Sequence, residues 1–247
     1  MKRLIEALAV SVAATLALAA AVAADGHARV VIPFDMEVDG AAEGVAVNWN
    51  GDVFVGLSVQ GRMLKVPGGV GEAHELATLE GLAEGDFGLT GHGFNSDGWL
   101  YAGVVSSNPD LNGLVAIDPD SGSWMHVAGT EQMAMANALE TDGWGGLWVT
   151  DTVLGAVWRV FVYGDLPDNP PVVEMWVQDP LLEGTGELPY PFPIGANGID
   201  VDFAGNTVYV ANTERSTIVG IPITHEGAAG EPFVHAELPG VAADGIA

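Results

Sequence analysis

Five side chains that could bind a cation or transfer a proton occur at one position of a repeated sequence pattern. Four of them open a short apolar run that leads, through a turn containing glycine, toward a second apolar run, and the fifth begins the same pattern at residues 243–247. They are Glu43, His92, Asn137, Asn197 and Asp244. Hard cations such as Ca²⁺ prefer about six to eight oxygen ligands, which carboxylates, amide carbonyls and water supply. An imidazole titrates near neutral pH and can accept a proton from water beside such a cation.

Four of these five side chains offer oxygen. A single Asn or Asp at the start of a strand is more simply explained as a cap for local backbone groups. Four oxygen donors at equivalent places of a repeat instead favour a divalent-cation site, with Ca²⁺ as the expected ion. We call its predicted ligands the axial set: Glu43, Asn137, Asn197 and Asp244. Asn137 and His92 are also the candidate catalytic residues, with the alternative that His92 lines a channel and bonds a strand end.

The spacing of the five residues indicates which elements position them. They are 49, 45, 60 and 47 positions apart, and a period near 50 residues of short strands is typical of β-propeller blades. Inner strands of a propeller start at one end of its channel, so these residues would meet on the axis. The expected strands are 43–48, 52–57, 61–66 and 74–79; 92–95, 99–105, 113–118 and 124–128; 137–140, 146–150, 156–161 and 172–177; and 197–202, 207–211, 217–221 and 232–236.

The fold class that this pattern predicts is an all-β, six-bladed propeller in one domain. The chain has 247 residues, whereas six blades would need about 300. Four repeats are followed by residues 243–247, which begin a fifth. We therefore expect a propeller that is incomplete at its C-terminus, after the fourth blade and the first strand of the next. Residues 29–34 are expected to form a strand that closes the last blade.

The N-terminal residues have the organisation of a secretory signal. Met1-Lys2-Arg3 is positively charged, an alanine- and leucine-rich run continues to Ala24, and small residues stand at the end of that run. We expect residues 1–24 to be a signal peptide and residues 25–247 to be the propeller domain, exported to the periplasm or outside the cell. The alternative is an uncleaved anchor, because the run is nearly long enough to span a bilayer. No membrane association is expected after cleavage.

Composition limits the partners of the exported domain. The chain has 33 Asp and Glu against 7 Lys and Arg, a formal net charge of −26. Such a surface repels phosphate backbones, which excludes nucleic acid as an expected partner, and it attracts cations. The same charge suggests a protein that works in high salt, where self-repulsion is screened. The chain contains no cysteine, so stability must come from packing, ring closure or a bound metal.

A proline-rich insertion precedes the fourth repeat. Pro189, Pro191 and Pro193 exclude a central strand and stiffen the segment. Because the segment leads directly to the fourth repeat, Tyr190 and Phe192 are predicted to wall a substrate pocket there, together with His92. The alternative is a stiff surface connector with no contact to a ligand.

Short motifs at the repeat starts resemble those of a known family. Glu43-Gly44, Asn137, Asn197-Gly198-Ile199 and Asp244-Gly245-Ile246-Ala247 are similar, in this order, to the senescence-marker-protein/gluconolactonase (regucalcin-like) family of six-bladed propellers. The resemblance covers about residues 42–247. It implies that the axial set holds the catalytic divalent cation of the family, usually calcium.

A paraoxonase-like feature accompanies the resemblance. His92-Gly93 stands where paraoxonases carry a histidine implicated in proton transfer, whereas gluconolactonases have a substrate-binding Asn-Asp-Gly near that point. This departure makes sugar lactones a less favoured substrate.

The predicted function is calcium-dependent hydrolysis of small-molecule lactones or related esters. Water activated by the metal or by His92 would attack a carbonyl that the cation polarises. The alternative is a non-catalytic extracytoplasmic binding propeller with a structural calcium, because propellers host many functions. The sequence does not indicate an oligomeric state.

Overall fold

The computed structural model describes residues 40–142, 145–162 and 169–246. Within these ranges the chain forms sixteen strands and one 3₁₀ turn, η1 (Pro67–Gly69). The strands make four antiparallel sheets of four strands each, and the strand order in each sheet follows the sequence.

The sheets correspond to the four predicted repeats. The first contains β1 (Ala42–Val47), β2 (Val53–Leu57), β3 (Arg62–Val66) and β4 (His74–Thr78). The second contains β5 (Gly88–Phe94), β6 (Leu100–Val105), β7 (Gly113–Ile117) and β8 (Trp124–His126). The third contains β9 (Ala136–Thr141), β10 (Gly146–Asp151), β11 (Ala156–Phe161) and β12 (Val172–Gln178). The fourth contains β13 (Ala196–Val201), β14 (Thr207–Asn212), β15 (Thr217–Pro222) and β16 (Phe233–Glu237).

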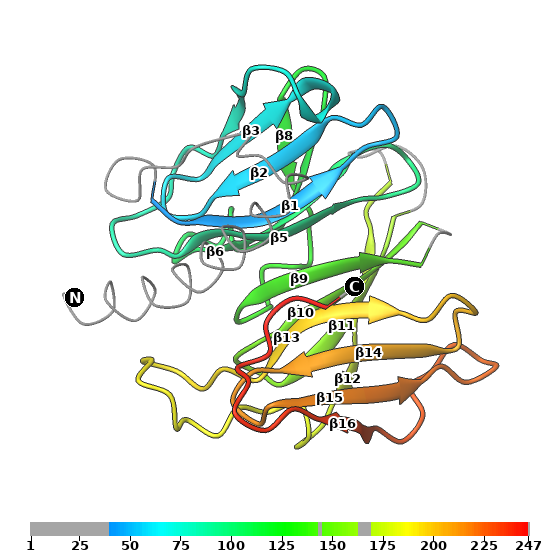
Figure 1. Ribbon diagram of the computed structural model, residues 1–247. Coiled ribbons are helices and arrows are strands. Elements are labelled where there is room, and N and C mark those ends of the chain that lie inside the picture. Colours follow the sequence, from blue (N-terminus) through cyan, green and yellow to red (C-terminus); the bar gives the residue numbers. More distant parts are fainter. Residues whose placement is uncertain (1–39, 143–144, 163–168, 247) are drawn as a thin grey trace, which may run out of the picture.

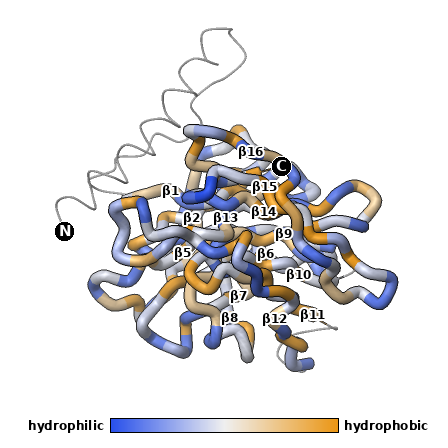
Figure 2. The backbone as a smooth tube through the Cα atoms, turned by 90° about the horizontal axis from the view of Figure 1, so that it is seen from below, coloured by the Kyte–Doolittle hydropathy of each residue, from blue (hydrophilic) through white to orange (hydrophobic). Residues whose placement is uncertain are grey.

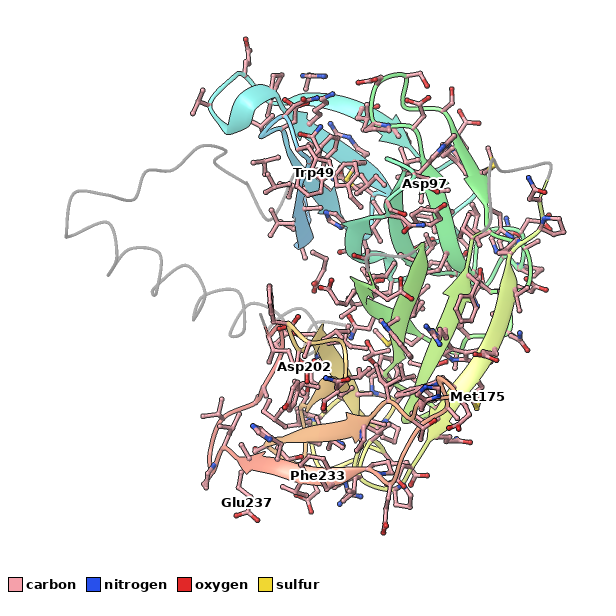
Figure 3. The ribbon with its side chains drawn as sticks, turned by 90° about the vertical axis from the view of Figure 1, so that its right-hand side faces the viewer. Trp49, Asp97, Met175, Asp202, Phe233 and Glu237 are labelled. Atoms are coloured by element: carbon pink, nitrogen blue, oxygen red, sulfur yellow. The ribbon has the colours of Figure 1, made fainter. Side chains whose placement is uncertain are left out.

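The four sheets are successive blades around one axis. Their innermost strands contact one another in order, β1 with β5, β5 with β9 and β9 with β13, and these strands lie in the middle of the molecule (Figure 1). Seen from the side, the blades follow one another around an arc (Figure 3). The predicted all-β propeller architecture is therefore confirmed, with four blades in the described residues.

Apolar side chains between neighbouring blades hold the arc together. Phe54, of the first blade, and Val115, of the second, belong to one buried cluster, and the next two pairs of blades are joined by similar clusters. Hydrophobic residues recur along the strands, while hydrophilic stretches occupy many of the loops (Figure 2). Burying one Leu, Val or Phe side chain fully stabilises the folded state by roughly 1.5–3 kcal/mol. Blade packing of this kind can stabilise a domain that lacks cysteine.

One inner strand begins earlier than the sequence pattern predicts. β5 starts at Gly88, four residues before His92, whereas β1, β9 and β13 each start one residue before Glu43, Asn137 and Asn197. The difference shifts the position of His92 relative to the other repeat starts. No helix in the described ranges is long and apolar enough to cross a membrane. The predicted signal peptide, residues 1–24, and the predicted closing strand, residues 29–34, lie outside the described residues.

Candidate metal centre

The structure connects the four residues of the axial set. The Asn137 Nδ2 donates a hydrogen bond to Asn197 Oδ1 over 3.0 Å. The Asn197 amide in turn hydrogen-bonds the carboxyl group of Asp244, and the charge of Asp244 acts on the carboxyl group of Glu43. Residues from three different blades and from the segment after β16 thus meet at one place. Whether they bind a cation stays a prediction.

Irregular pairing at the start of each inner strand places these side chains. The register shifts between Glu43 and Val45 in β1, and equivalent shifts occur near the starts of β5, β9 and β13. A bulge turns the local side chain away from the ordinary pleat. The residue that follows is small because the next repeat approaches closely: a Cβ on Gly198 would collide with the Asp244 carbonyl oxygen, to which the Gly198 N–H donates.

The same close approach identifies which residue of the second blade faces the axial set. A Cβ on Gly44 would approach the carbonyl oxygen of Thr90, and a Cβ on Gly91 would approach that of Asn137. The pairing register agrees, because the shift in β5 begins after Leu89. Thr90, rather than His92, is therefore the structural equivalent of Glu43 and Asn137. His92 lies two residues further along the strand.

His92 is buried between the first and second blades, where it is 7% exposed. Its Nε2 lies 3.2 Å from the Phe54 carbonyl oxygen and its Nδ1 lies 3.3 Å from the Thr90 carbonyl oxygen. Burial lowers the pKa of His92, and the two carbonyl contacts oppose that shift only in part. Because both ring nitrogens face backbone acceptors, this geometry suits the channel-lining alternative. A role for His92 in proton transfer stays a prediction.

The two carboxyl groups of the axial set both have raised pKa values. Burial, and then the charge of Asp244, raise the pKa of Glu43 to about 7. Burial also raises the pKa of Asp244, which the hydrogen bond from Asn197 partly offsets. Burial is the larger cause for Glu43 and the only cause that raises the pKa of Asp244, as expected for carboxyl groups removed from water.

The donor set fits a hard cation. Within the described part of the chain, neither the Glu43 carboxyl group nor Asn137 Oδ1 accepts a hydrogen bond, so both remain able to bind an ion. No three His, Cys, Asp or Glu side chains cluster as metal ligands among the described residues. A cation would therefore depend on the amide oxygens of Asn137 and Asn197 as much as on the carboxylates, a mixture that calcium accepts.

Two threonines that the sequence did not single out contact the axial amides. Thr152 Oγ1 accepts a hydrogen bond from Asn137 Nδ2 at 2.8 Å, and Thr213 Oγ1 accepts one from Asn197 Nδ2 at 2.9 Å. Each threonine directly follows the second strand of its blade. The recurrence of Asp-Thr and Asn-Thr at residues 151–152 and 212–213 is the signal that could have identified them.

A cavity of about 600 Å³ lies along the channel beside the axial set. Four of its lining residues immediately follow the four predicted ligands: Gly44, Ala138, Gly198 and Gly245. The lining continues along β1 and β5 to the turns at their far ends, including the fully exposed Trp49. Trp49 and Asp97 mark these two turns (Figure 3). The size is within the range of small-molecule sites.

Of the three residues predicted for a substrate pocket, His92 lines this cavity, whereas Tyr190 and Phe192 do not. Their segment leads into the opposite end of β13, where the Gly195 N–H donates to the Thr152 carbonyl oxygen. Both side chains are partly exposed. Their predicted place in a substrate pocket would thus be on the loop side of the axial set, and it stays a prediction.

Glu214 fastens that segment to the blade. Its carboxylate accepts hydrogen bonds from the N–H groups of Gly186 and Leu188 and from the Thr185 hydroxyl group. Glu214 directly follows Thr213, so the residue that contacts the axial amide and the residue that holds the segment are adjacent.

Comparisons with known proteins support the fold. The sequence matches no model of a known protein family and no curated protein. Similar solved structures include a streptogramin B lyase (16% identity, TM-score 0.57, covering 83% of this chain and 58% of that chain). They also include a gluconolactonase from Xanthomonas campestris (18% identity, TM-score 0.56, covering 83% and 65%) and an auxiliary nutrient binding protein from Bacteroides ovatus (13% identity, TM-score 0.57, covering 81% and 48%).

The chain spans about half to two thirds of the length of these three structures. Gluconolactonases are among the proteins that share its fold, which agrees with the resemblance seen in the motifs. The three neighbours have different described activities, so the likeness does not select one. The comparisons establish that this chain has a β-propeller fold.

Proposed function

We propose that this chain is a calcium-dependent hydrolase of lactones or related esters that acts in the periplasm or outside the cell. The observation that carries the proposal is the connected axial set, in which the partly buried carboxyl group of Glu43 meets the charge of Asp244 beside two asparagine amides. A bound divalent cation would remove the electrostatic cost that raises the pKa of Glu43. The signal-like residues 1–24 support the proposed location.

The proposed chemistry divides between the ion and the chain. When bound, calcium supplies a Lewis acid that stabilises negative charge developing on the substrate carbonyl oxygen. Glu43 and Asp244 would hold the ion and balance its charge, while Asn137 Oδ1 and Asn197 Oδ1 would complete the ligand set without adding negative charge. Attack by water on the carbonyl breaks the acyl C–O bond, and the released oxygen takes a proton to give an acid and an alcohol.

Proton acceptance from the attacking water fits the axial carboxylates better than His92. Both nitrogens of His92 lie within 3.3 Å of backbone carbonyl oxygens, so a proton taken up there would be shared with the backbone. The axial carboxylates would lie beside a water bound to the cation, because they are predicted ligands of that cation. We therefore propose Glu43 or Asp244 as the proton acceptor, with the two asparagines as ligands of the cation.

The activities given for two of the similar solved structures are relevant to the substrate class. One neighbour is described as a gluconolactonase, which favours lactone hydrolysis within this fold. Another is described as a streptogramin B lyase, so the same fold also carries a different reaction. The axial oxygen donors, rather than the fold, are the reason to prefer hydrolysis here.

The test is hydrolysis of a panel of lactones, aryl esters and phosphotriesters by the purified protein. Each substrate is assayed with calcium, then with a chelator, and then after calcium is restored. We expect turnover of a lactone or carboxylic ester that disappears on chelation and returns with calcium. Turnover that stays the same in the presence of the chelator would contradict the proposed role of the cation in hydrolysis.

A binding propeller with a structural calcium is the second candidate. The burial of His92 between two backbone carbonyls favours it, because this removes the imidazole that a hydrolase could have used. One neighbour is described as an auxiliary nutrient binding protein. A folded, calcium-loaded protein that hydrolyses nothing in the panel would support this candidate and overturn the hydrolase.

A further inference from the structure

Thr152 and Thr213 make the same pair of hydrogen bonds in successive blades. Thr152 Oγ1 donates to the Ala196 carbonyl oxygen over 2.7 Å, and Thr213 Oγ1 donates to the Ala243 carbonyl oxygen over 2.6 Å. Ala196 and Ala243 are the residues that immediately precede Asn197 and Asp244. Each threonine therefore links the axial amide of its own blade to the backbone beside the next axial residue.

These bonds determine which way each axial amide faces. A hydroxyl group has one hydrogen to donate, and in Thr152 that hydrogen goes to a carbonyl oxygen, which can only accept. Thr152 Oγ1 can therefore only accept from Asn137, so the Asn137 NH₂ group must face it and Oδ1 must point elsewhere. The same reasoning fixes the Asn197 amide against Thr213.

Both threonines are held firmly enough to impose this orientation. Thr152 is 1% exposed and Thr213 is 8% exposed. The Thr152 N–H donates to the Met135 carbonyl oxygen and the Thr213 N–H donates to the Gly195 carbonyl oxygen, each over 3.1 Å. Hydrogen bonds thus hold both the backbone N–H and the side-chain hydroxyl group of each threonine without a ligand.

The first blade provides an internal comparison. Ser58 occupies the corresponding position after β2, and its N–H donates to the Ala41 carbonyl oxygen over 2.9 Å. Its hydroxyl group bonds the same carbonyl oxygen and no axial side chain. The axial residue of this blade is Glu43, whose two carboxylate oxygens are equivalent. Only an amide, which presents either oxygen or nitrogen, needs a partner that selects its orientation.

We propose that Thr152 and Thr213 are positioning residues that turn the oxygen atoms of Asn137 and Asn197 toward a bound cation. This inference rests on the proposed cation site and adds the residues that make it selective for a cation over an anion or water. If either amide were reversed, its NH₂ group would face the ion and repel it.

Calcium binding, measured by isothermal titration with calcium chloride, tests the proposal without reference to activity. Thr152→Val and Thr213→Val keep the side-chain shape but cannot accept from the amide. We expect each to weaken calcium affinity by about 10- to 100-fold, the usual effect of removing a partner that orients a metal ligand. Thr152→Ser keeps the hydroxyl group and should bind calcium within about twofold of the wild type.

Two controls separate orientation from stability. Ser58→Ala changes the corresponding position of the first blade and should leave calcium affinity unchanged. Thr130→Val removes a fully buried hydroxyl group that donates to the Val127 carbonyl oxygen and accepts from the Leu114 N–H. It should lower the melting temperature without changing calcium affinity. Where valine prevents folding, Thr152→Ala against Thr152→Ser gives the same comparison.

The outcomes distinguish this inference from the proposed function. A wild-type protein that binds no calcium would overturn the proposed cation site and this inference with it. A wild-type protein that binds calcium, with folded Thr152→Val and Thr213→Val variants that bind it equally well, would overturn the positioning role alone.

Discussion

Asn137 Nδ2 lies 3.0 Å from Asn197 Oδ1, so a side-chain hydrogen bond joins the axial residues of the third and fourth blades directly. The side-chain NH₂ groups at this site already donate hydrogen bonds within the protein. Asn137 donates to Thr152 and Asn197. Asn197 donates to Thr213 and Asp244. The groups left for a ligand are acceptors. A site of acceptors with two carboxyl groups is suited to a cation.

Asn137→Ala tests this arrangement most directly. The change removes one oxygen ligand and both hydrogen bonds of the amide, so calcium-dependent turnover of the best substrate should fall by about 100-fold or more. The measurement is kcat/KM at saturating calcium. Asn50→Ala, in an exposed turn, is the control and should behave as wild type. An Asn137→Ala enzyme with full activity would rule out the role of Asn137.

The raised pKa of Glu43 predicts how stability depends on pH without calcium. Its pKa is about 7 in the folded protein against an ordinary 4.5, so the folded state binds the proton more tightly than the unfolded state. This contribution to stability is fully present below about pH 4.5 and is lost as pH rises through about 7. The loss is roughly 3 kcal/mol.

Urea unfolding in the presence of chelator measures this loss. The free energy of unfolding of the wild type, relative to that of Glu43→Gln, should fall between about pH 4.5 and 7, and calcium should restore it at the higher pH. Referring the wild type to this variant cancels the titrating groups that do not interact with Glu43, so the difference reports Glu43 and its coupling to Asp244. Parallel pH profiles for the two proteins would show that Glu43 has an ordinary pKa.

His92→Ala should destabilise the protein more than it impairs catalysis. The change empties a buried site between two blades and removes the partner of the Phe54 and Thr90 carbonyl oxygens, at a cost of about 2–3 kcal/mol. We expect a lower melting temperature and a kcat close to wild type below that temperature. A kcat reduced about 100-fold with an unchanged melting temperature would instead establish His92 as the proton acceptor.

The outcome for His92 shows what the repeat could and could not predict. The repeated short apolar runs, separated by turns that contain glycine, predicted most strand boundaries within one or two residues, because the strands are apolar where they pack between blades. The start of β5 was missed because His92-Gly93 resembles the Asn-Gly motif of the fourth repeat. Only the bulge after Leu89 shows that Thr90 takes that place. Bulges depend on the approach of the next blade, which no local pattern reports.

The threonine contacts were beyond sequence reasoning for a related reason. Thr152 and Thr213 lie 15 and 16 residues after the asparagines that they contact. The pairing depends on the register of β9 with β10 and of β13 with β14, and in both pairs the register shifts at the bulge. A hairpin counted without its bulge would place a different residue opposite the amide.

High salt should stabilise the folded protein. The ion pairs among the described residues involve Arg62, Lys65 and Arg159, whereas the whole chain carries 33 acidic residues. Most negative charges therefore lack a cationic partner, and repulsion between them is screened as the Debye length falls from about 30 Å at 0.01 M salt to about 3 Å at 1 M.

The measurement is the melting temperature across that range of potassium chloride, with chelator present so that calcium does not contribute. A gain of about 2 kcal/mol would raise the melting temperature by roughly 4–8 °C. A melting temperature that does not rise would show that self-repulsion is not significant in this fold and would remove the high-salt hypothesis.

Glu214→Gln should loosen the segment that carries Tyr190 and Phe192. The glutamine side chain has one acceptor oxygen in place of the two that bond Gly186, Leu188 and Thr185. Amide exchange at residues 186 and 188 should therefore become faster. If Tyr190 and Phe192 wall the substrate pocket, KM should rise about fivefold, which corresponds to roughly 1 kcal/mol of lost binding, with little change in kcat. Glu187→Gln, an exposed change in the same segment, is the control. Faster exchange with an unchanged KM would identify the segment as a surface connector, because a wall of the pocket cannot loosen without affecting the bound substrate.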